Sequence, residues 1–322
     1  MTTFYLLGNN GYSVQDTPEP EEWVKPLVAA RLTRLEFFMD HLEPVFYETI
    51  VREKSEFYQA IVRTLAANRI AVDSFTTGRL LYLTNGLSHP FADARREAQR
   101  WLALTARTAA ALGAPMIGGH YDYISLRDWR DPRAVQRMLD GMLAFAESAA
   151  REGIRAIALE QMYTPSLRPY TMADMEDIIG RLNERSAVPI YPMCDVGHMA
   201  VADPKDPAHT AADKDPCAWL ARKYGGQDNV FVHLQQTDAV HSRHWPFIAA
   251  RNAEGIISVE RVIRAIESSG VARAWLSLEI LSARGTPIDA IAGDIAASAE
   301  HVRGVLKKLG YAEEQGRFTR AG

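Results

Sequence analysis

Four residues with ionisable side chains close four successive apolar segments of the sequence. They are Glu160, Asp195, His233 and Glu279, separated by 35, 38 and 46 residues. Three carboxylates and one imidazole brought to one place repel one another unless a cation lies between them. Such a ligand set suits Mn²⁺ or Mg²⁺ and could also hold Co²⁺ or Zn²⁺. The spacing therefore predicts a divalent-metal site, with Mn²⁺ as the expected ion.

Short apolar segments that alternate with longer amphipathic stretches must position these residues. The expected strands are residues 4–7, 34–39, 71–75, 116–119, 156–160, 190–195, 230–235 and 275–280. Helical patterns lie between them, for example at residues 92–112, 258–269 and 287–309, each followed by a glycine. Eight such units favour a closed (β/α)₈ TIM barrel over an open doubly wound sheet. In a barrel the carboxyl ends of all strands meet at one mouth. We expect residues 1–322 to form a single catalytic domain.

The composition excludes several classes of protein. The chain has 322 residues, of which 47% are hydrophobic and 24% charged, and its formal net charge is −4. We expect no nucleic-acid partner, because no basic footprint is present. No apolar run approaches the ~18 residues of a membrane span. The first residues lack the basic start and apolar stretch of a signal peptide, so we expect no secretory leader. With only two cysteines, a cytoplasmic location is expected.

Four motifs at the predicted strand ends carry a resemblance to a known family. They are Ala158-Leu159-Glu160, Cys194-Asp195-Val196-Gly197-His198-Met199, His233-Leu234-Gln235-Gln236-Thr237-Asp238 and Leu278-Glu279. In these motifs, and over most of its length, the sequence resembles the sugar phosphate isomerase/epimerase family. These are xylose-isomerase-like barrels that include ketose 3-epimerases and inosose isomerases.

The resemblance implies an activity and a role for each motif residue. Glu160, Asp195, His233 and Glu279 would be the metal ligands, and His198 would bind substrate oxygens. Glu160 and Glu279 would exchange protons with a substrate carbon on opposite faces. Removing a proton beside a carbonyl creates an ene-diolate, which needs its charge neutralised. The implied enzyme is a metal-dependent isomerase or epimerase of a small ketose or aldose, free or phosphorylated.

Two positions depart from the ketose 3-epimerases of this family. Ser166 and Ala239 stand where those enzymes carry a Glu and an Arg. This difference argues against a free ketohexose as the substrate. Other polar residues near the strand ends are therefore expected to bind the substrate: Gln161, Gln235, Asp238, His244 and Arg284.

Two further polar residues lie within or just after predicted strands. His120 follows Gly118-Gly119 and is either an additional catalytic base or a loop-capping residue. Glu36 stands inside the second predicted strand, where we expect it to point into the barrel and pair with a cation or water.

The sequence is also compatible with other functions. The chain could be the large catalytic subunit of a C-glycoside deglycosidase, cleaving a C–C bond of a 3-keto-glycoside with His120 as base. That enzyme would need a small partner subunit, whereas the isomerase would act alone or as a homo-oligomer. A metal- or sugar-binding protein without turnover is the non-enzymatic alternative. The net charge and the presence of only four expected ligands argue against a DNA-cleaving relative that uses several metals.

Overall fold

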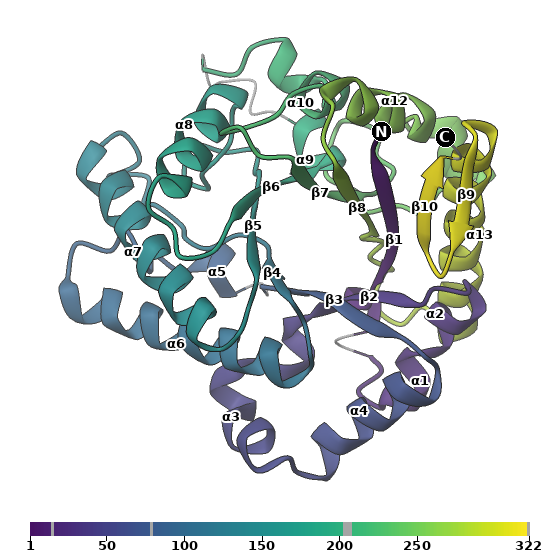
Figure 1. The fold of residues 1–322 in the computed structure, drawn as a ribbon, viewed down its shortest axis with the longest axis horizontal. Coiled ribbons are helices and arrows are strands. Elements are labelled where there is room, and N and C mark those ends of the chain that lie inside the picture. The colour runs from purple at the N-terminus through teal and green to yellow at the C-terminus, as the bar shows by residue number, and fades with distance from the viewer. Residues whose placement is uncertain (14–15, 78–79, 202–207, 321–322) are drawn as a thin grey trace.

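A computed structural model describes residues 1–13, 16–77, 80–201 and 208–320, and its parallel strands close into a barrel (Figure 1). The eight barrel strands are β1 (Thr3–Asn9), β2 (Arg34–Phe38), β3 (Ala71–Thr76), β4 (Met116–Gly118), β5 (Ala156–Glu160), β6 (Ile190–Asp195), β7 (Asn229–Leu234) and β8 (Arg273–Leu278). Neighbours in the sequence pair in parallel, and β1 pairs with both β8 and β2, which closes the ring. The predicted (β/α)₈ TIM barrel is confirmed.

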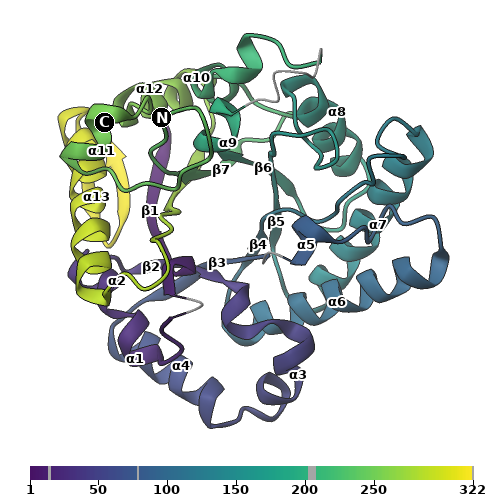
Figure 2. The same ribbon diagram turned by 180° about the vertical axis from the view of Figure 1, so that it is seen from behind.

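Helices surround this ring of strands. The longer ones are α3 (Pro44–Glu53), α4 (Glu56–Ala67), α6 (Ala92–Ala111), α7 (Pro132–Arg151), α8 (Met172–Asn183), α12 (Val259–Ser269) and α13 (Ile288–Lys308). Shorter helices are α1 (Pro20–Trp23), α2 (Lys25–Ala29), α5 (Leu80–Leu83), α9 (Val196–Ala200), α10 (Pro216–Leu220) and α11 (Ala249–Glu254). Three 3₁₀ turns complete the set: η1 (Gly11–Ser13), η2 (Met39–Leu42) and η3 (Ala212–Lys214). The segments that follow the strands' carboxyl ends, including α5 and α11, lie toward the viewer in Figure 2.

The predicted helix ends agree with the local hydrogen bonding. Ser258 caps α12, since its hydroxyl accepts a hydrogen bond from the Arg261 backbone N–H at 3.4 Å. The same helix ends at Gly270, whose φ of 72° is the left-handed conformation that glycine adopts at helix ends without strain. Local sequence chemistry thus sets where α12 begins and ends.

The interior of the barrel is divided into an apolar half and a polar half. Inward-facing residues near the strands' amino ends form a small apolar cluster of Leu7, Met116, Ala156, Ala158, Met193 and Phe231. Because side chains alternate along a strand, Glu160 points inward two residues beyond Ala158. The same step leads from Met193 to Asp195 and from Phe231 to His233. The buried polar groups therefore gather at the carboxyl-end mouth.

A C-terminal hairpin, absent from the sequence prediction, seals the seam beside β1. Strand β10 (Arg317–Arg320) pairs antiparallel with β9 (Tyr311–Glu314) and also with β1 at Phe4 and Tyr5. On the same edge of β1, strand β2 pairs only at Gly8 and Asn9. The barrel is therefore splayed at the amino end of β1, and β10 occupies the gap (Figure 1).

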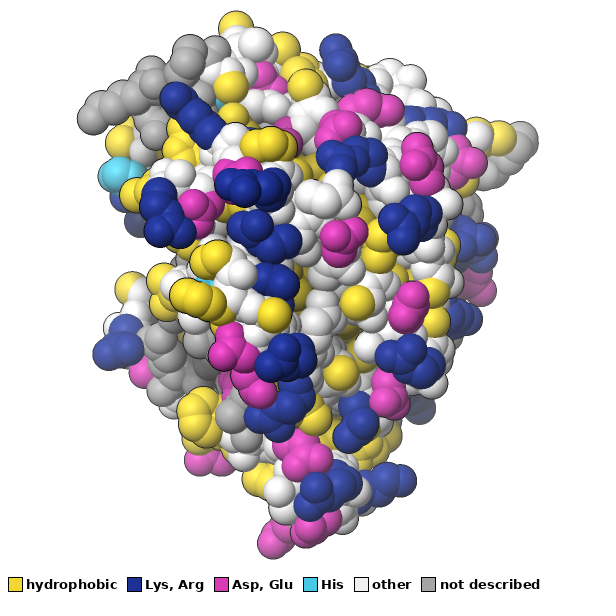
Figure 3. All heavy atoms as spheres, turned by 90° about the vertical axis from the view of Figure 1, so that its left-hand side faces the viewer, with side chains coloured by type: hydrophobic (Ala, Val, Ile, Leu, Met, Phe, Trp, Pro, Cys, Tyr) yellow, Lys and Arg dark blue, Asp and Glu magenta, His cyan; other side chains and the backbone are white. Residues whose placement is uncertain are grey.

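The outer surface is mixed in charge. On the side of the barrel that carries α6, α7 and α8, Lys and Arg side chains are interspersed with Asp and Glu (Figure 3). In the described part of the chain, none of the helices combines the length and hydropathy needed to cross a membrane.

His41 is a buried histidine beneath the β1 and β2 loops. Its Nε2 lies 3.1 Å from the Ser13 hydroxyl and 3.2 Å from the Asn10 carbonyl, and its ring packs against Trp23. Burial lowers the pKa of His41 from 6.5 to about 4, although the Asn10 carbonyl acts in the opposite direction. The folded chain therefore keeps this imidazole neutral down to a pH at which the unfolded chain is protonated.

We predict that His41 makes the protein less stable in mild acid. Between pH 7.5 and 5 the unfolded chain takes up a proton at this site that the folded chain does not. The free energy of unfolding should therefore fall by roughly 2 kcal/mol from this residue alone. Urea unfolding at the two pH values measures this change. Between pH 7.5 and 5, the free energy of unfolding of His41→Gln should fall by about 2 kcal/mol less than that of the wild type. Equal losses would contradict the prediction.

Candidate metal centre

The four residues expected to bind a metal lie together at the carboxyl-end mouth. Glu160, Asp195, His233 and Glu279 are all buried, and one ligand atom from each lies within 4.8 Å of all the others. Nδ1 of His233 is 2.9 Å from Oε1 of Glu160 and 3.0 Å from Oε2 of Glu279. Glu160 and Asp195 end β5 and β6, His233 lies in β7, and Glu279 directly follows β8. The barrel thus brings together residues that are far apart in the sequence.

Glu36 holds the opposite side of the His233 ring. Both carboxylate oxygens of Glu36 lie 3.1 Å from Nε2 of His233. Asn9, Thr76 and Ser277 donate further hydrogen bonds to the same carboxylate, Ser277 at 2.6 Å. As an imidazolium, His233 donates from Nε2 to Glu36 and from Nδ1 to Glu160. Loss of the Nδ1 proton would free a lone pair there for a metal ion, while Nε2–H still donates to Glu36. Glu36 therefore points into the barrel and pairs with a cationic partner, as its place in an apolar strand predicted.

Burial and charge shift the pKa values of these groups. Burial acts to lower the pKa of His233, but Glu279, Glu36 and Glu160 outweigh it and raise that pKa well above its ordinary value. For Glu160, burial acts to raise the pKa of the carboxyl, but the charge and hydrogen bond of His233 and the charge of His198 together outweigh it and lower that pKa. For Glu279, burial dominates and raises the pKa. The pKa values of Glu160 and Glu279 are thus displaced in opposite directions.

The donor set fits a divalent cation. Three buried carboxylates and one imidazole provide oxygen and nitrogen ligands at close range, and a single imidazolium balances only one of the three negative charges. Oε2 of Glu279 is buried and accepts no hydrogen bond from a described residue. Glu160, Asp195 and Glu279 would bind such an ion through oxygen, and His233 through Nδ1.

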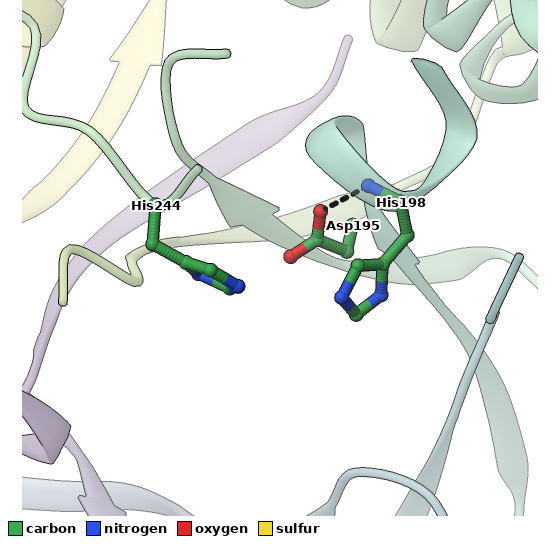
Figure 4. Close-up of side chains that lie close together, drawn as sticks. All are labelled: Asp195, His198 and His244. Atoms are coloured by element: carbon green, nitrogen blue, oxygen red, sulfur yellow. Dashed lines mark hydrogen bonds between the residues drawn. The ribbon is translucent and has the colours of Figure 1, made fainter. Parts of the chain in front are cut away.

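A second cluster of possible ligands adjoins the first. Asp195, His198 and His244 also lie within 4.8 Å of one another, with both imidazole rings directed toward the space beside the Asp195 carboxylate (Figure 4). The Gln235 amide nitrogen occupies this space. It lies 2.9 Å from each Asp195 oxygen and 3.4 Å from Nε2 of His244. We therefore interpret this cluster as a hydrogen-bonded support for Asp195 rather than as a second metal site.

Backbone carbonyls orient both histidines of this second cluster. Nδ1 of His198 lies 3.2 Å from the Gln161 carbonyl, and Nδ1 of His244 lies 3.1 Å from the Glu279 carbonyl. Each Nδ1–H can donate there, which leaves Nε2 as an acceptor on the mouth side. His244 has a φ of 50°, in the left-handed region that non-glycine residues rarely adopt. Such backbone strain is concentrated at functional sites.

Gly197 is required by the close approach of α9 to β7. The Asp195 carboxylate accepts hydrogen bonds from the backbone N–H groups of Gly197 and His198, at 2.7 and 2.8 Å. A Cβ at Gly197 would lie 2.3 Å from Cδ of Gln235. The Asp195-Val196-Gly197-His198 motif therefore both starts a helix and leaves room for the amide that supports Asp195.

A small cavity opens beside the two clusters. Its volume is about 280 Å³, and its lining includes Phe38, Thr76, His198, His244 and Glu279. This volume lies at the small end of ligand pockets, which typically measure ~300–1,000 Å³. The cavity is thus lined by both histidines of the second cluster and by one carboxylate of the first.

His120 and Gln161 lie next to the group of Glu160, Asp195, His233 and Glu279, which is called the metal cluster below. His120 is fully buried, and its Nε2 donates a hydrogen bond to the Asp122 carbonyl. Burial lowers the pKa of His120 to about 4, which keeps the imidazole neutral near pH 7. Gln161 is also buried, and its Oε1 has no hydrogen-bond donor among the described residues. This oxygen is available to accept a hydrogen bond from a hydroxyl group of a ligand.

Two expected substrate-binding residues are not brought to the cluster. The Asp238 carboxylate pairs with Arg243 at 2.8 Å and accepts the backbone N–H groups of Val240 and His241. It therefore stabilises the loop after β7. Arg284 is exposed in the segment between β8 and α13. Of the two departures from the family pattern, Ser166 is buried and Ala239 adopts a φ of 63°.

Comparisons with known proteins agree with this fold. Residues 34–308 match the xylose isomerase-like TIM barrel family, so the chain belongs to that family. It is 26% identical over 302 residues to D-erythrulose 1-phosphate 3-epimerase of Brucella abortus (strain 2308), covering 90% of this chain and 94% of the relative. The resemblance seen in the sequence is confirmed.

Solved structures share the fold at lower sequence identity. A protein of Rhodospirillum rubrum assigned as a xylose isomerase superposes with a TM-score of 0.79 at 19% identity, covering 94% of this chain and 99% of that one. D-psicose 3-epimerase of Clostridium cellulolyticum H10 gives a TM-score of 0.61 at 13% identity, covering 94% and 97%.

We predict that Glu36→Gln weakens metal binding without unfolding the protein. The amide would turn an NH₂ group toward donors that now meet a carboxylate, so His233 would lose its fixed orientation. The dissociation constant for Mn²⁺, measured by calorimetry, should rise by roughly 10- to 100-fold. Glu147→Gln, a change at an exposed position on α7, is the matched control. An affinity within two-fold of wild type would show that Glu36 does not act on the metal site.

Proposed function

We propose that this protein is a divalent-metal-dependent epimerase of a short sugar phosphate, acting by proton transfer at the carbon beside a carbonyl. The observation that carries the proposal is the placement of Glu160 at the end of β5 and of Glu279 directly after β8, the two outer strands of the four neighbours β5 to β8. Both carboxylates lie within about 3 Å of the same nitrogen of His233. Two carboxylates that flank a substrate from different strands can act on its opposite faces, as an epimerisation requires.

Each residue of the site has a separate role in the proposed reaction. Glu160 removes the proton from one face of the substrate carbon, and Glu279 returns a proton to the other face. In the reverse direction the two residues exchange roles. When bound, a divalent ion supplies charge stabilisation to the substrate oxygens on which negative charge develops. His198 and the free Oε1 of Gln161 bind hydroxyl groups, while Gln235 and Glu36 hold Asp195 and His233 in place.

Two observations support a small phosphorylated substrate. The relative from Brucella abortus is named as an epimerase of a four-carbon ketose phosphate, and it aligns over 90% of this chain. The mouth cavity of about 280 Å³ suits a molecule of that size better than a hexose derivative with an aromatic group.

The proposal includes Mn²⁺ as the ion, a small carbohydrate as the binding partner and a cytoplasmic location. Oxygen-rich ligands with one imidazole support Mn²⁺. The net charge of −4 supports a small-molecule substrate over a nucleic acid. Both cysteines are free thiols, as is usual in a reducing compartment. The enzyme would act alone or as a homo-oligomer.

We predict that Glu160→Gln and Glu279→Gln each abolish turnover but preserve the fold. Each change removes a group that transfers a proton, a contribution of about 10²–10⁴-fold in kcat. The far-UV circular dichroism spectrum should match that of wild type. Glu147→Gln, an isosteric change at an exposed position, should keep full activity. A variant with near-normal kcat would remove the corresponding carboxylate from the mechanism.

The substrate and reaction type can be read from solvent hydrogen exchange. We predict that the Mn²⁺-loaded protein in D₂O incorporates deuterium at C3 of D-erythrulose 1-phosphate, followed by NMR. Because C3 is the one stereocentre of this molecule, the product is its enantiomer, L-erythrulose 1-phosphate, and its formation is followed by the change in optical rotation. Unphosphorylated erythrulose should react more slowly. Label at C1 or C2 with an aldose product would indicate an isomerase instead.

The deglycosidase alternative leads to a different outcome in the same experiment. It requires His120 as the base and a small partner subunit. No label in any free or phosphorylated four- to six-carbon sugar, together with cleavage of an aryl 3-keto-C-glycoside, would replace the epimerase proposal with this one. Co-purification of a small subunit from the native host would support that replacement.

A further inference from the structure

A second cavity lies at the opposite end of the barrel from the metal cluster. Its volume is about 390 Å³, and its lining includes Arg34, Arg155, Arg273, Tyr5 and Trp275. These residues lie at or near the amino ends of the strands, the face on which the β9–β10 hairpin sits (Figure 1). We call it the lower cavity.

Three guanidinium groups are distributed around the lower cavity. Arg34 is the first residue of β2, Arg155 directly precedes β5, and Arg273 is the first residue of β8. These strands are spaced around the ring, so the three side chains approach the cavity from different sides. A guanidinium presents several N–H donors in a planar fork that matches the oxygens of a phosphate group.

The positive charge of the lower cavity is only partly balanced. Arg34 pairs with Asp73 at 2.6 Å, and its guanidinium lies 4.9 Å from the centre of the Tyr5 ring. Within the described ranges, no carboxylate forms an ion pair with Arg155 or Arg273. Asp73 is the only acidic residue in the cavity lining, so the lining carries an excess of two positive charges. Such an excess attracts a dianion.

An aromatic layer separates the lower cavity from the metal cluster. The Trp275 ring stacks on the rings of Tyr5 and Tyr191, with ring centroids 5.5 and 6.2 Å apart. It also stacks on the Phe231 ring, at a centroid distance of 6.5 Å. Along β5, Arg155 and Glu160 are five residues apart, or about 17 Å at 3.3 Å per residue. A molecule in the lower cavity therefore cannot reach the proton-transferring carboxylates.

We propose that the lower cavity binds a small phosphate-bearing dianion, at a site separate from the catalytic mouth. Arg155 and Arg273 donate hydrogen bonds to the phosphate oxygens, and Arg34 contributes long-range attraction while it remains paired with Asp73. The partly exposed rings of Tyr5 and Trp275 contact any organic group that the phosphate carries. The site does not depend on which sugar the enzyme converts.

Calorimetric titration of the full-length, metal-loaded protein tests the proposal, with inorganic phosphate and phenyl phosphate as separate probes. We expect saturable binding of at least one probe. Tighter binding of phenyl phosphate would identify an organic phosphate as the ligand, and equal binding would identify phosphate itself. Arg155→Gln/Arg273→Gln should weaken binding by about ten-fold or more. Arg96→Gln/Arg185→Gln, which removes the same charge from exposed helical and loop positions, should change it less than two-fold.

A second measurement on the wild-type chain avoids any effect of mutation on folding. Phosphate should protect Arg155 and Arg273 from modification by phenylglyoxal, read by peptide mass spectrometry, while Arg96 and Arg185 react at unchanged rates. Three results would overturn the proposal: no saturable binding, equal weakening in both double variants, or binding that is lost in His198→Asn but retained in Arg155→Gln/Arg273→Gln.

Discussion

The imidazole of His233 is held between carboxylates inside a barrel that excludes water, and the metal cluster depends on this arrangement. Glu36 contacts Nε2, while Glu160 and Glu279 lie at Nδ1. Buried carboxylates are stable only when paired with a cation or hydrogen-bonded, so removing His233 would take the shared cationic partner from Glu36, Glu160 and Glu279. The same requirement makes the cluster suited to a divalent ion, which would compensate the charge that one imidazolium leaves.

The division of the barrel interior explains how one fold can keep this charge buried. The apolar layer of Leu7, Met193 and Phe231 provides the hydrophobic packing that fills the barrel toward the amino ends of the strands. In the polar layer at the carboxyl ends, Glu36 is surrounded by hydrogen-bond donors, whereas Oε2 of Glu279 and Oε1 of Gln161 have no donor among the described residues. Because every second side chain of a strand faces inward, β5, β6 and β7 each contribute a residue to both layers. The aromatic stack around Trp275 also separates the catalytic mouth from the lower cavity.

The loop after β7 connects the cluster of four expected metal ligands to the cavity at the mouth of the barrel. Gln236 and Trp245 form a pair of backbone hydrogen bonds, at 2.8 and 3.1 Å, that fold the intervening segment back on itself. This turn places His244 against the Glu279 carbonyl and the Gln235 amide against Asp195. One loop thus supports Asp195 and lines the mouth cavity through His244. Under the proposed function, its sequence can alter substrate choice without changing the four cluster residues.

The sequence by itself determined the barrel, the strands that end in ionisable residues and the four residues of the cluster, because alternation and strand-end polarity are local patterns. Only the tertiary structure decided the partners. Glu36 meets His233 across 197 residues of sequence, and the Gln235 amide settles between Asp195 and His244. Asp238, expected at the substrate, pairs instead with Arg243. Partner choice depends on the register and curvature of strands that close a ring, and no local pattern of residues encodes those distances.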